Sequence, residues 1–521
     1  MIKKETSIYE NLLINLPTNK KEVAFTYEFK KFSYKHLLDL INTFSFNLNK
    51  KGIKKGDVVT LCLVNIPSTV YLLFAINQIG AKANLIHPLM QKEMILKSMK
   101  QLNSSFLFVL ENRFNELNSL TKENICITYL SPVKELNLVK KRYYYLKNKK
   151  YANDDYLYKK GIYKAYEKEY KEDSFFLHSG GTSGESKIIS LSNYSINSLI
   201  ENIPYIIDFK ICKKIKMSSF LPIFHGFGLA LGLIAPLMYQ GSCALIPKFR
   251  TKIVLNYIKR KNINVLIGVP TVYEALLNNK SFDGKLLRNL YISFVGGDFS
   301  SKSLFKRFNE LMIKNKSNCR LFEGYGLTET VTVCSVNSFQ FNKAMSVGKI
   351  FPNIKIKIKD LNSNEYLPIN CIGEICVGGE TLMNKYMFSS IDSFIYIDNE
   401  KYVKTGDVGY IDQDNFLFLK SRIKRLIKIK GINIFPYDIE SIVNEEKEVE
   451  NSIVLEMKDE HSSYIKLFIV LKKEYKNVNI DNKLKEKIKE QLGVYSVPEE
   501  IVYVNEFKRT LIGKIDYKNL T

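Results

Sequence analysis

The sequence lacks the cysteine patterns that mark a zinc site or a disulfide framework. Its eight cysteines include no C-x-x-C pair, and none is spaced with histidines in the way that zinc ligands are. The start, MIKKETSIYENLL, also lacks the apolar core and the small-residue cleavage site of a secretory leader. These absences predict reduced, mostly buried thiols and a cytoplasmic location.

Acidic residues are scarce relative to basic ones. The chain has 53 Asp and Glu against 77 Lys and Arg, a formal net charge of +24, which suits nucleic acid, an anionic membrane surface or anionic small molecules. The lysines are spread along the whole chain, however, with no arginine-rich stripe and no recognisable nucleic-acid motif. We therefore expect no nucleic-acid partner and at most peripheral contact with a membrane.

One segment, residues 140–173, keeps the nucleic-acid alternative open. It is rich in lysine and tyrosine, and basic residues interleaved with aromatic rings can neutralise and stack on a nucleic acid. The segment also carries Asp and Glu and lies between β-like runs. These features favour a solvated connection instead.

Charged residues are absent from residues 218–247, a run long enough to cross a bilayer. Pro222, His225, Pro236 and several glycines interrupt this run, and its ends show no aromatic belt. A buried helix in a large α/β core therefore explains the run better than a membrane span.

What the sequence does contain is an alternation of short β-rich runs with helix-length amphipathic segments. At 521 residues, with 45% hydrophobic and 25% charged residues, the chain is long enough for more than one domain. VVTLCLV at 58–64 precedes an expected helix near 67–79, and LYISFVGG at 290–297 precedes a helical run from Ser301. This alternation predicts an α/β fold with mainly parallel, layered sheets, whose ligands lie at the carboxyl ends of the strands.

Toward the C-terminus the pattern changes twice. Closely spaced short strands, separated by Gly, Asn and Asp turns, predict a β-rich subdomain at about 340–420. Beyond it, SIVLEM, YIKLFIVLKK and a lysine-rich helix near 482–492 predict a small α+β domain. We therefore divide the chain into a large N-terminal domain, 1–420, and a C-terminal domain, 421–521.

A loop of small residues, HSGGTSGESK at 178–187, follows an apolar run. Few side chains block its backbone N–H groups and hydroxyls from a polyphosphate, and Lys187 can add a positive charge. Gly184 is followed by Glu185 rather than by a lysine, so this is not the Walker A sequence of P-loop ATPases. Taken alone, the loop could equally be a flexible linker.

Further stretches occur after this loop in a fixed order. They are FLPIFHGFG (220–228), EGYGLTET (323–330), YVKTGDVGY (402–410) with SRIKRLIKIKGINIFPYDIE (421–440), and RTLIGKI (509–515). Together with the loop they resemble the acyl-adenylate-forming (AMP-binding) superfamily, which includes acyl-CoA and aryl-CoA synthetases, the adenylation domains of nonribosomal peptide synthetases, and luciferases. The resemblance covers nearly the whole chain and favours the CoA synthetase branch.

The resemblance implies an ATP-dependent reaction in two steps. A carboxylate oxygen attacks the α-phosphate of ATP, pyrophosphate leaves, and the acyl group then passes to a thiol. The charge that builds on phosphate oxygens is stabilised by pre-aimed donors, a cation and a divalent metal. In the family the small-residue loop closes over the β- and γ-phosphates, which assigns this role to Ser179, Gly181, Thr182, Ser183, Gly184 and Lys187.

Other nucleotide contacts follow from the later motifs. By resemblance, Tyr325 offers a flat face to the adenine, Thr328 reaches the α-phosphate, and Glu329 is an oxygen ligand for Mg²⁺. VGGDFS at 295–300 resembles the glycine-rich wall of the adenine pocket. The glycines expected to contact the nucleotide are Gly296, Gly297 and Gly326.

The motifs nearest the C-terminus supply the ribose contact and a catalytic lysine. Asp407 in TGD matches the carboxylate that accepts both ribose hydroxyls, and Arg422 matches the arginine that supports the same ribose and phosphate. Lys514 matches the lysine that bridges the carboxylate and the α-phosphate during adenylation.

In the family the small domain rotates after adenylation, so that one active site runs both half-reactions. The hinge of this rotation falls at Lys424 in the present sequence. The rotation takes Lys514 away and presents the loop of Lys430 and Gly431 to the thiol, where the glycine allows the pantetheine arm to approach.

The sequence only partly identifies the acid substrate and the thiol acceptor. Amino-acid-activating relatives usually have an aspartate in the stretch that matches 220–228, whereas this chain has FHG there. We therefore expect a fatty or other acyl acid without an α-amino group, with His225 as the gating residue and Phe227 and Gly228 lining the acyl pocket. Coenzyme A is the expected acceptor, and phosphopantetheine on an acidic acyl carrier protein is the alternative.

Two other functions stay open. One is an amino-acid adenylation enzyme, which the missing aspartate disfavours. The other is a non-catalytic basic protein that binds nucleic acid or membrane on this fold. An inactive scaffold would have no need to keep all of Lys187, Thr328, Glu329, Asp407, Arg422 and Lys514.

Overall fold

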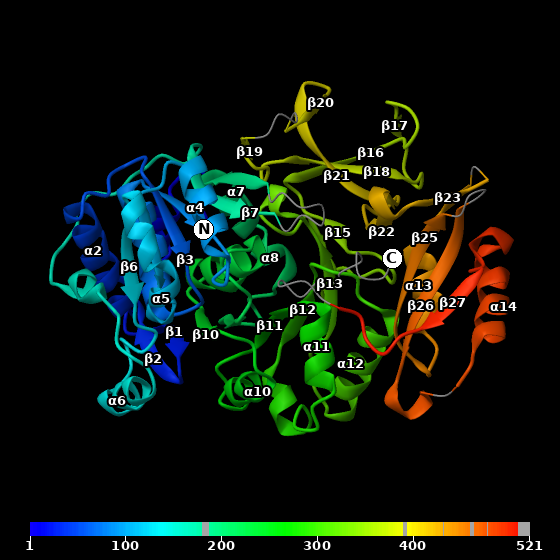
Figure 1. Cartoon of the computed structure of the whole chain (residues 1–521), viewed down its shortest axis with the longest axis horizontal. Coiled ribbons are helices and arrows are strands. Elements are labelled where there is room, and N and C mark those ends of the chain that lie inside the picture. The colour runs from blue at the N-terminus through cyan, green and yellow to red at the C-terminus, as the bar shows by residue number, and fades with distance from the viewer. Residues whose placement is uncertain (180–186, 389–392, 431, 459–462, 477, 509–521) are drawn as a thin grey trace.

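The computed structural model describes residues 1–521 except 180–186, 389–392, 431, 459–462, 477 and 509–521. Most of the large N-terminal part consists of mainly parallel sheets with helices packed around them (Figure 1). The parallel strands confirm the predicted α/β fold class. A smaller α+β part follows at the C-terminal end of the chain.

One sheet holds the strand that leads into the 178–187 loop. From edge to edge its strands are β19 (Lys385–Met387), β8 (Ile188–Ser192), β7 (Asp173–His178), β4 (Lys82–Leu85), β3 (Val58–Cys62), β5 (Phe106–Leu110) and β6 (Cys126–Leu130). From β7 to β6 all neighbours are parallel, whereas β8 and β19 pair in antiparallel fashion. The β7–β8 hairpin therefore places the loop at the carboxyl end of a parallel strand.

A second sheet holds the EGYGLTET motif. Its strands in order are β15 (Lys349–Ile350), β14 (Ser335–Val336), β13 (Leu321–Tyr325), β12 (Ile292–Val295), β11 (Val265–Gly268), β9 (Lys216–Ser219), β10 (Ser242–Leu245), β1 (Val23–Tyr27) and β2 (Lys30–Ser33). The stretch from β13 to β1 is parallel. VGGDFS and EGYGLTET thus leave the carboxyl ends of neighbouring strands.

Helix α3 (Pro67–Ile79) shows how local sequence produces this core. All of its residues are buried, which fits a segment without a charged side chain. Pro67 lies in the first turn, where its missing N–H would be unpaired in any case. The expected helix near 67–79 is confirmed. The other α-helices of this part are α1 (Ile8–Ile14), α2 (Tyr34–Lys50), α4 (Lys92–Gln101), α5 (Phe114–Leu117), α6 (Leu138–Lys147), α7 (Asn193–Ile200), α8 (Ile203–Ile206), α9 (Ala235–Met238), α10 (Thr251–Lys259), α11 (Pro270–Leu277) and α12 (Lys302–Lys314).

The uncharged run at 218–247 is buried, as predicted, but it is not one helix. A π-helix over Phe227–Ile234 precedes α9, and strands β9 and β10 flank them. Pro236 cannot donate an N–H to the carbonyl four residues back, so the regular α-helical ladder is interrupted there. In the described part of the chain, no helix is long and apolar enough to cross a membrane.

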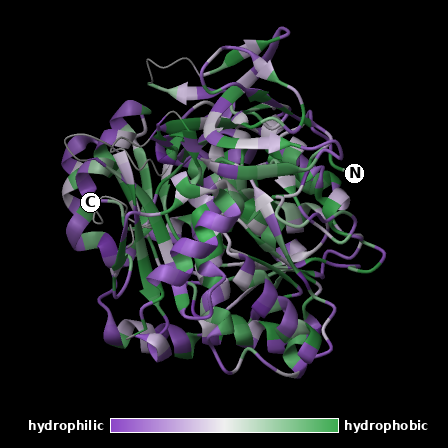
Figure 2. Cartoon of the chain, turned by 90° about the vertical axis from the view of Figure 1, so that its right-hand side faces the viewer, coloured by the Kyte–Doolittle hydropathy of each residue, from purple (hydrophilic) through white to green (hydrophobic). Residues whose placement is uncertain are grey.

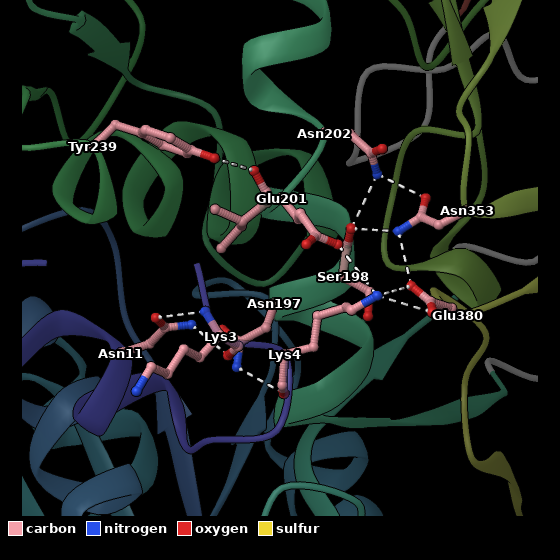
Figure 3. A network of polar contacts seen from close by, with 11 residues as sticks. Lys3, Lys4, Asn11, Asn197, Ser198, Glu201, Asn202, Tyr239, Asn353 and Glu380 are labelled. Carbon is pink, nitrogen blue, oxygen red and sulfur yellow. Dashed lines mark hydrogen bonds and ion pairs between the residues drawn. The ribbon is translucent and has the colours of Figure 1, made fainter. Parts of the chain in front are cut away.

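The β-rich segment forms a sheet of its own above the parallel sheets in Figure 1. Its strands are β17 (Tyr366–Leu367), β16 (Ile354–Lys359), β18 (Gly373–Gly379), β21 (Glu400–Ile411) and β20 (Ile395–Ile397), and β22 (Leu417–Arg422) pairs with β21. Polar contacts hold this sheet to the N-terminal segment and to α7, as Figure 3 shows: Lys4 Nζ lies 2.9 Å from Glu380 Oε2, and Asn353 Nδ2 donates to Ser198 O at 2.8 Å.

The C-terminal part has a separate hydrophobic cluster. It is built on strands β25 (Val449–Lys458), β26 (Ser463–Leu471) and β27 (Glu500–Tyr503), with helices α13 (Pro436–Asn444) and α14 (Asp481–Leu492). Figure 2, which views this side, shows hydrophobic residues along the strands and many hydrophilic residues on the helices. The sequence predicted β25, β26 and α14, but it missed α13, β27 and the hairpin of β23 (Ile427–Ile429) and β24 (Ile432–Ile434).

The segment 140–173 is only partly the solvated connection that we expected. Its first residues belong to α6, which has no buried residue. Farther along, Tyr156 and Tyr158 turn inward, and their hydroxyls lie 2.8 Å from Thr128 Oγ1 and 3.0 Å from Ser68 Oγ. Burial raises the pKa of both phenols. These rings therefore anchor the segment to the body of the protein.

Candidate active site

The carboxylate of Asp407, on β21, is contacted by two side chains from other strands. They are Tyr325 from β13 and Arg422 from β22. The Tyr325 hydroxyl donates to Asp407 Oδ2 at 2.8 Å, and Arg422 Nε lies 3.0 Å from Oδ1. Burial, and then the charge of Asp407, raise the pKa of Tyr325 well above its usual value, so the hydroxyl stays protonated and donates. Each carboxylate oxygen accepts one protein bond and keeps capacity for a second donor, such as a ribose hydroxyl.

A second group joins Lys187, the expected phosphate contact, to the EGYGLTET motif. The Tyr386 hydroxyl on β19 donates to Glu329 Oε1 at 2.9 Å, and Lys187 Nζ lies 4.3 Å from the centroid of the Tyr386 ring. The backbone supports the same contact, because Met383 N donates to Glu329 O at 2.7 Å. Tyr386 thus touches both a candidate metal ligand and a candidate phosphate ligand. Sequence reasoning missed it, because no local motif marks it.

The base of the 178–187 loop is closed by paired hydrogen bonds. Ser179 N donates to Lys187 O at 2.9 Å, and Lys187 N donates to Ser179 Oγ at 3.2 Å. These bonds hold the two ends of the loop together at the end of β7. The remaining expected phosphate contacts, Gly181, Thr182, Ser183 and Gly184, lie outside the described residues.

The backbone of FLPIFHGFG approaches the chain just after EGYGLTET so closely that only glycine fits at Gly226, and the EGYGLTET segment folds back on itself as closely at Gly326. A Cβ atom on Gly226 would lie 1.6 Å from Val331 O, and one on Gly326 would lie 1.5 Å from Thr332 O. Between them Val331 has φ of 66°, a left-handed conformation that is costly for a β-branched residue. Thr328 begins the 3₁₀ turn that leads into this strained position. The two motifs are therefore locked side by side.

A row of rings lines the FLPIFHGFG turn. His87, from the loop after β4, packs edge-on against Phe224 with centroids 4.8 Å apart, and Phe224 packs against His225 at 4.5 Å. Burial lowers the pKa of His87, which favours its neutral form. Phe227 and Gly228 begin the π-helix just beyond the turn. His87 is a pocket candidate that the sequence did not reveal, since it lies about 140 residues before the motif.

Gly296 and Gly297, which we expect to contact the nucleotide, follow the end of β12. A Cβ atom on Gly296 would lie 2.7 Å from Gly324 O, so β12 and β13 approach closely at that point, and Gly297 follows directly. On β13, burial raises the pKa of Glu323 to about 8, which makes it a neutral carboxyl at moderately acidic pH. Sequence reasoning gave Glu323 no role, although it opens the EGYGLTET motif.

The chain beyond β22 connects this site to the C-terminal part. Phe299 stacks on Tyr437 of α13 with centroids 5.0 Å apart, and Arg425 both pairs with Glu440 and lies over the Tyr437 ring. Lys424 is exposed in a short 3₁₀ turn over Ile423–Arg425.

Lys430, which we expect in the loop presented to the thiol, lies on the C-terminal part. It has φ of 49°, and its Nζ lies 6.0 Å from the centroid of Tyr495. Gly431 and Lys514 lie outside the described residues.

The residues present fit a nucleotide with one magnesium ion. Glu329 is a carboxylate that contacts the same tyrosine, Tyr386, as Lys187 does, and Mg²⁺ is commonly held by one or two carboxylates together with phosphate oxygens and water. Within the described residues, no group of three or more His, Cys, Asp or Glu side chains comes together as an all-protein metal site. Bound there, the ion would neutralise charge on the phosphate oxygens.

Comparison with known proteins identifies the architecture. A family model described as "AMP-binding enzyme" matches residues 15–387, and one described as "AMP-binding enzyme C-terminal domain" matches residues 438–514. The chain is 24% identical over 489 residues to 4-coumarate--CoA ligase 4 of Arabidopsis thaliana, covering 91% of this chain and 83% of that protein. It is 27% identical over 465 residues to probable 4-coumarate--CoA ligase 2 of Dictyostelium discoideum, covering 85% and 82%.

Solved structures share the fold over the whole chain. ATP-bound MatB from Rhodopseudomonas palustris superposes with a TM-score of 0.86 at 20% identity, covering 99% of this chain and 98% of that one. The anthranilate CoA ligase AuaEII in complex with anthranoyl-AMP gives a TM-score of 0.85 at 20% identity, covering 99% and 97%. The fold therefore extends beyond the N-terminal part to the small C-terminal domain.

Proposed function

The chain belongs to the AMP-binding enzyme family, and on that premise we propose that it activates a carboxylic acid without an α-amino group and transfers the acyl group to coenzyme A. It is an AMP-forming acid–thiol ligase, as its relatives' names indicate. The observation that carries the proposal is the convergence of separate motifs on two contact groups, Tyr325–Asp407–Arg422 and Lys187–Tyr386–Glu329.

The adenylation step follows from the chemistry of these groups. A carboxylate oxygen of the acid attacks the α-phosphorus of ATP, a new P–O bond forms, and pyrophosphate leaves with the electron pair of the broken bond. Asp407 holds the ribose, and Lys187 and the 178–187 loop hold the outgoing phosphates. Fixed positive charge and N–H donors stabilise the charge that develops on the phosphate oxygens.

The thiol transfer uses the same acyl-adenylate. The deprotonated thiol of coenzyme A attacks the acyl carbon, a thioester bond forms, and AMP leaves with the electrons of the acyl–phosphate bond. The separate C-terminal hydrophobic cluster supports a domain boundary near 420–425, with rotation about Lys424 between the two steps. Phosphopantetheine on an acidic carrier protein remains the alternative acceptor.

The FLPIFHGFG turn and the relatives' names narrow the class of carboxylic acid that the enzyme activates. The FHG sequence in FLPIFHGFG lacks the aspartate expected for an α-ammonium group, and the neighbouring rings Phe224 and His87 form an aromatic wall. Relatives named for 4-coumarate and anthranilate support an aromatic acid alongside the fatty acid expected from the sequence. The choice between these two is the point that experiment must decide.

The test is carboxylate-dependent exchange of labelled pyrophosphate into ATP, followed by thioester formation with coenzyme A. The panel contains hydroxycinnamic, benzoic, short, medium and long fatty acids and the common amino acids. We expect Mg²⁺-dependent exchange with one class of acid lacking an α-amino group. Exchange with amino acids alone would overturn the assignment of the FLPIFHGFG turn, and no exchange with any acid would overturn the enzymatic proposal.

Tyr386→Phe is expected to weaken the use of Mg²⁺. The variant removes the hydroxyl that donates to Glu329 but keeps the ring under Lys187. A hydrogen bond to a charged group typically contributes enough that its loss raises the Mg²⁺ concentration for half-maximal exchange about tenfold. The KM for the acid should stay unchanged, because Tyr386 acts as a positioning residue.

The matched control is Tyr402→Phe, which removes a tyrosine hydroxyl 3.4 Å from Glu400 on β21. This control should behave like the unmodified enzyme. An unchanged Mg²⁺ dependence for Tyr386→Phe would contradict the positioning role. Tyr386→Leu, which also removes the ring, should additionally raise the KM for ATP.

A further inference from the structure

Helix α6 presents an apolar face that the rest of the described chain does not cover. Leu138, Val139, Tyr143 and Leu146 are 82%, 77%, 60% and 76% exposed. At about 100° per residue these positions fall within a sector of about 140° on one side of the helix, and the exposed Arg142 falls inside the same sector. Exposed apolar residues are unremarkable when scattered singly, but a contiguous set on one helix face marks an interaction surface.

Positive charge predominates around the same helix, although Lys140 Nζ pairs with Glu28 Oε2 at 3.4 Å. Residues 137–150 contain no Asp or Glu, and their basic residues are Lys140, Lys141, Arg142, Lys147, Lys149 and Lys150. Lys147 Nζ lies 4.8 Å from the centroid of the exposed Tyr143 ring, so charge flanks the apolar face directly. Lys30 on β2 extends the basic rim, because its Nζ bonds the carbonyl of Glu135, just before the helix.

The inner tyrosines hold the helix on the protein. The Tyr145 hydroxyl lies 2.6 Å from Ser131 Oγ and 3.1 Å from Glu111 Oε1, and burial raises the pKa of Tyr144 to about 12. These rings therefore pack against the body of the molecule. On the outer face the residues are mainly aliphatic, which suits insertion among lipid chains better than stacking on nucleic-acid bases.

We propose that α6 docks the protein on an anionic membrane surface. Leu138, Val139 and Leu146 enter the boundary between headgroups and acyl chains, while the flanking lysines and Arg142 contact anionic headgroups. The helix lies at the opposite end of the molecule from the β25–β27 sheet (Figure 1), so docking leaves the C-terminal part uncovered. This surface is independent of the adenylation site.

The test is co-sedimentation of the full-length protein with vesicles of phosphatidylcholine alone or with roughly 30 mol% phosphatidylglycerol. The protein should bind the anionic vesicles and release as salt rises. Leu138→Ser with Leu146→Ser should lower the partition coefficient at least about tenfold, because two apolar side chains that would be buried in the membrane are lost. The matched control is Ile211→Ser with Ile313→Ser, which removes residues 70% and 75% exposed elsewhere.

The contribution of the basic residues to membrane binding is tested with separate variants. Arg142→Glu with Lys149→Glu should lower binding to anionic vesicles about tenfold or more and flatten its salt dependence. Lys473→Glu with Lys489→Glu in the C-terminal part makes the same change in net charge away from the helix and should have a smaller effect. Thermal melting and adenylation in solution should be unchanged in all of these exposed-residue variants.

Certain results would overturn the proposal. One is equal binding of the α6 variants and their controls, and another is equal binding to neutral and anionic vesicles. A third is α6-dependent binding to a single-stranded RNA oligonucleotide that is tighter than binding to vesicles, which would assign the surface to nucleic acid. Because vesicle binding needs no turnover, these results are distinguishable from failure of the adenylation proposal.

Discussion

Asp407→Asn is expected to lower kcat/KM for ATP in pyrophosphate exchange about a hundredfold. The carboxylate accepts from Tyr325 and Arg422, and in the proposed function it also accepts the ribose hydroxyls. An amide of the same size offers one acceptor oxygen and turns an N–H₂ group toward one of these donors, which removes charge-assisted hydrogen bonds. The loss should appear mainly in KM, because the ribose is held in both the ground state and the transition state.

Direct AMP binding, measured by calorimetry, should weaken by a similar factor. Stability should fall only modestly, because the Arg422 side chain is 55% exposed and water can hydrate the guanidinium when the carboxylate is gone. Normal AMP affinity in the folded variant would contradict the ribose assignment.

Asp412→Asn provides the matched control. Asp412 follows the same strand, β21, is buried, and is paired with Lys343 rather than with a site residue. It lies about 16 Å along the strand from Asp407, given about 3.3 Å per residue. The control should cost stability without changing the KM for ATP, which separates a folding effect from loss of the ribose contact.

Much of the N-terminal architecture could be predicted because its signals are local. Helix α3 is an uncharged run bounded by Pro67 and Gly80, and β3 and β12 are β-branched or aromatic runs of strand length. Local signals of this kind need no knowledge of distant contacts. The shared role of EGYGLTET and TGD was, by contrast, expected only from the resemblance, since TGD lies within β21.

Contacts between distant segments could not be read in this way. Tyr386 reaches Glu329 across 57 residues, and His87 reaches Phe224 from a different sheet. Nothing in the neighbourhood of either residue distinguishes it from an ordinary core aromatic or loop histidine. The π-helix at Phe227–Ile234 was missed for another reason, since a composition without charge predicts burial but not the hydrogen-bond register.

Helix α13 shows a third limit. Its sequence, PYDIESIVN, is short and follows two brief strands, so its periodicity is weak. The packing of Tyr437 against Phe299 and Arg425 stabilises it in the folded protein, and both contacts lie outside the helix. The sequence therefore predicted the C-terminal α+β unit but not α13, whose Tyr437 contacts Phe299 of the VGGDFS stretch.

Lys514→Ala is expected to separate the two half-reactions. Lys514 lies outside the described residues, and its proposed role is to place a positive charge between the acid's carboxylate and the α-phosphate. Loss of such a pre-organised charge should slow acyl-adenylate formation by about 10² to 10³. Thioester formation from supplied acyl-adenylate should stay within about threefold of the unmodified enzyme, because in the proposed mechanism that step follows rotation of the lysine out of the site.

The control for this variant is Lys508→Ala, an exposed lysine six positions earlier in the chain. It should leave both half-reactions unchanged, which excludes a general effect of altered charge near the C-terminus. Equal loss of both half-reactions in Lys514→Ala would mean that the lysine supports the fold or the thiol step instead. Because one residue is predicted to affect one step, the ratio of the two rates tests domain rotation itself more sharply than either rate alone.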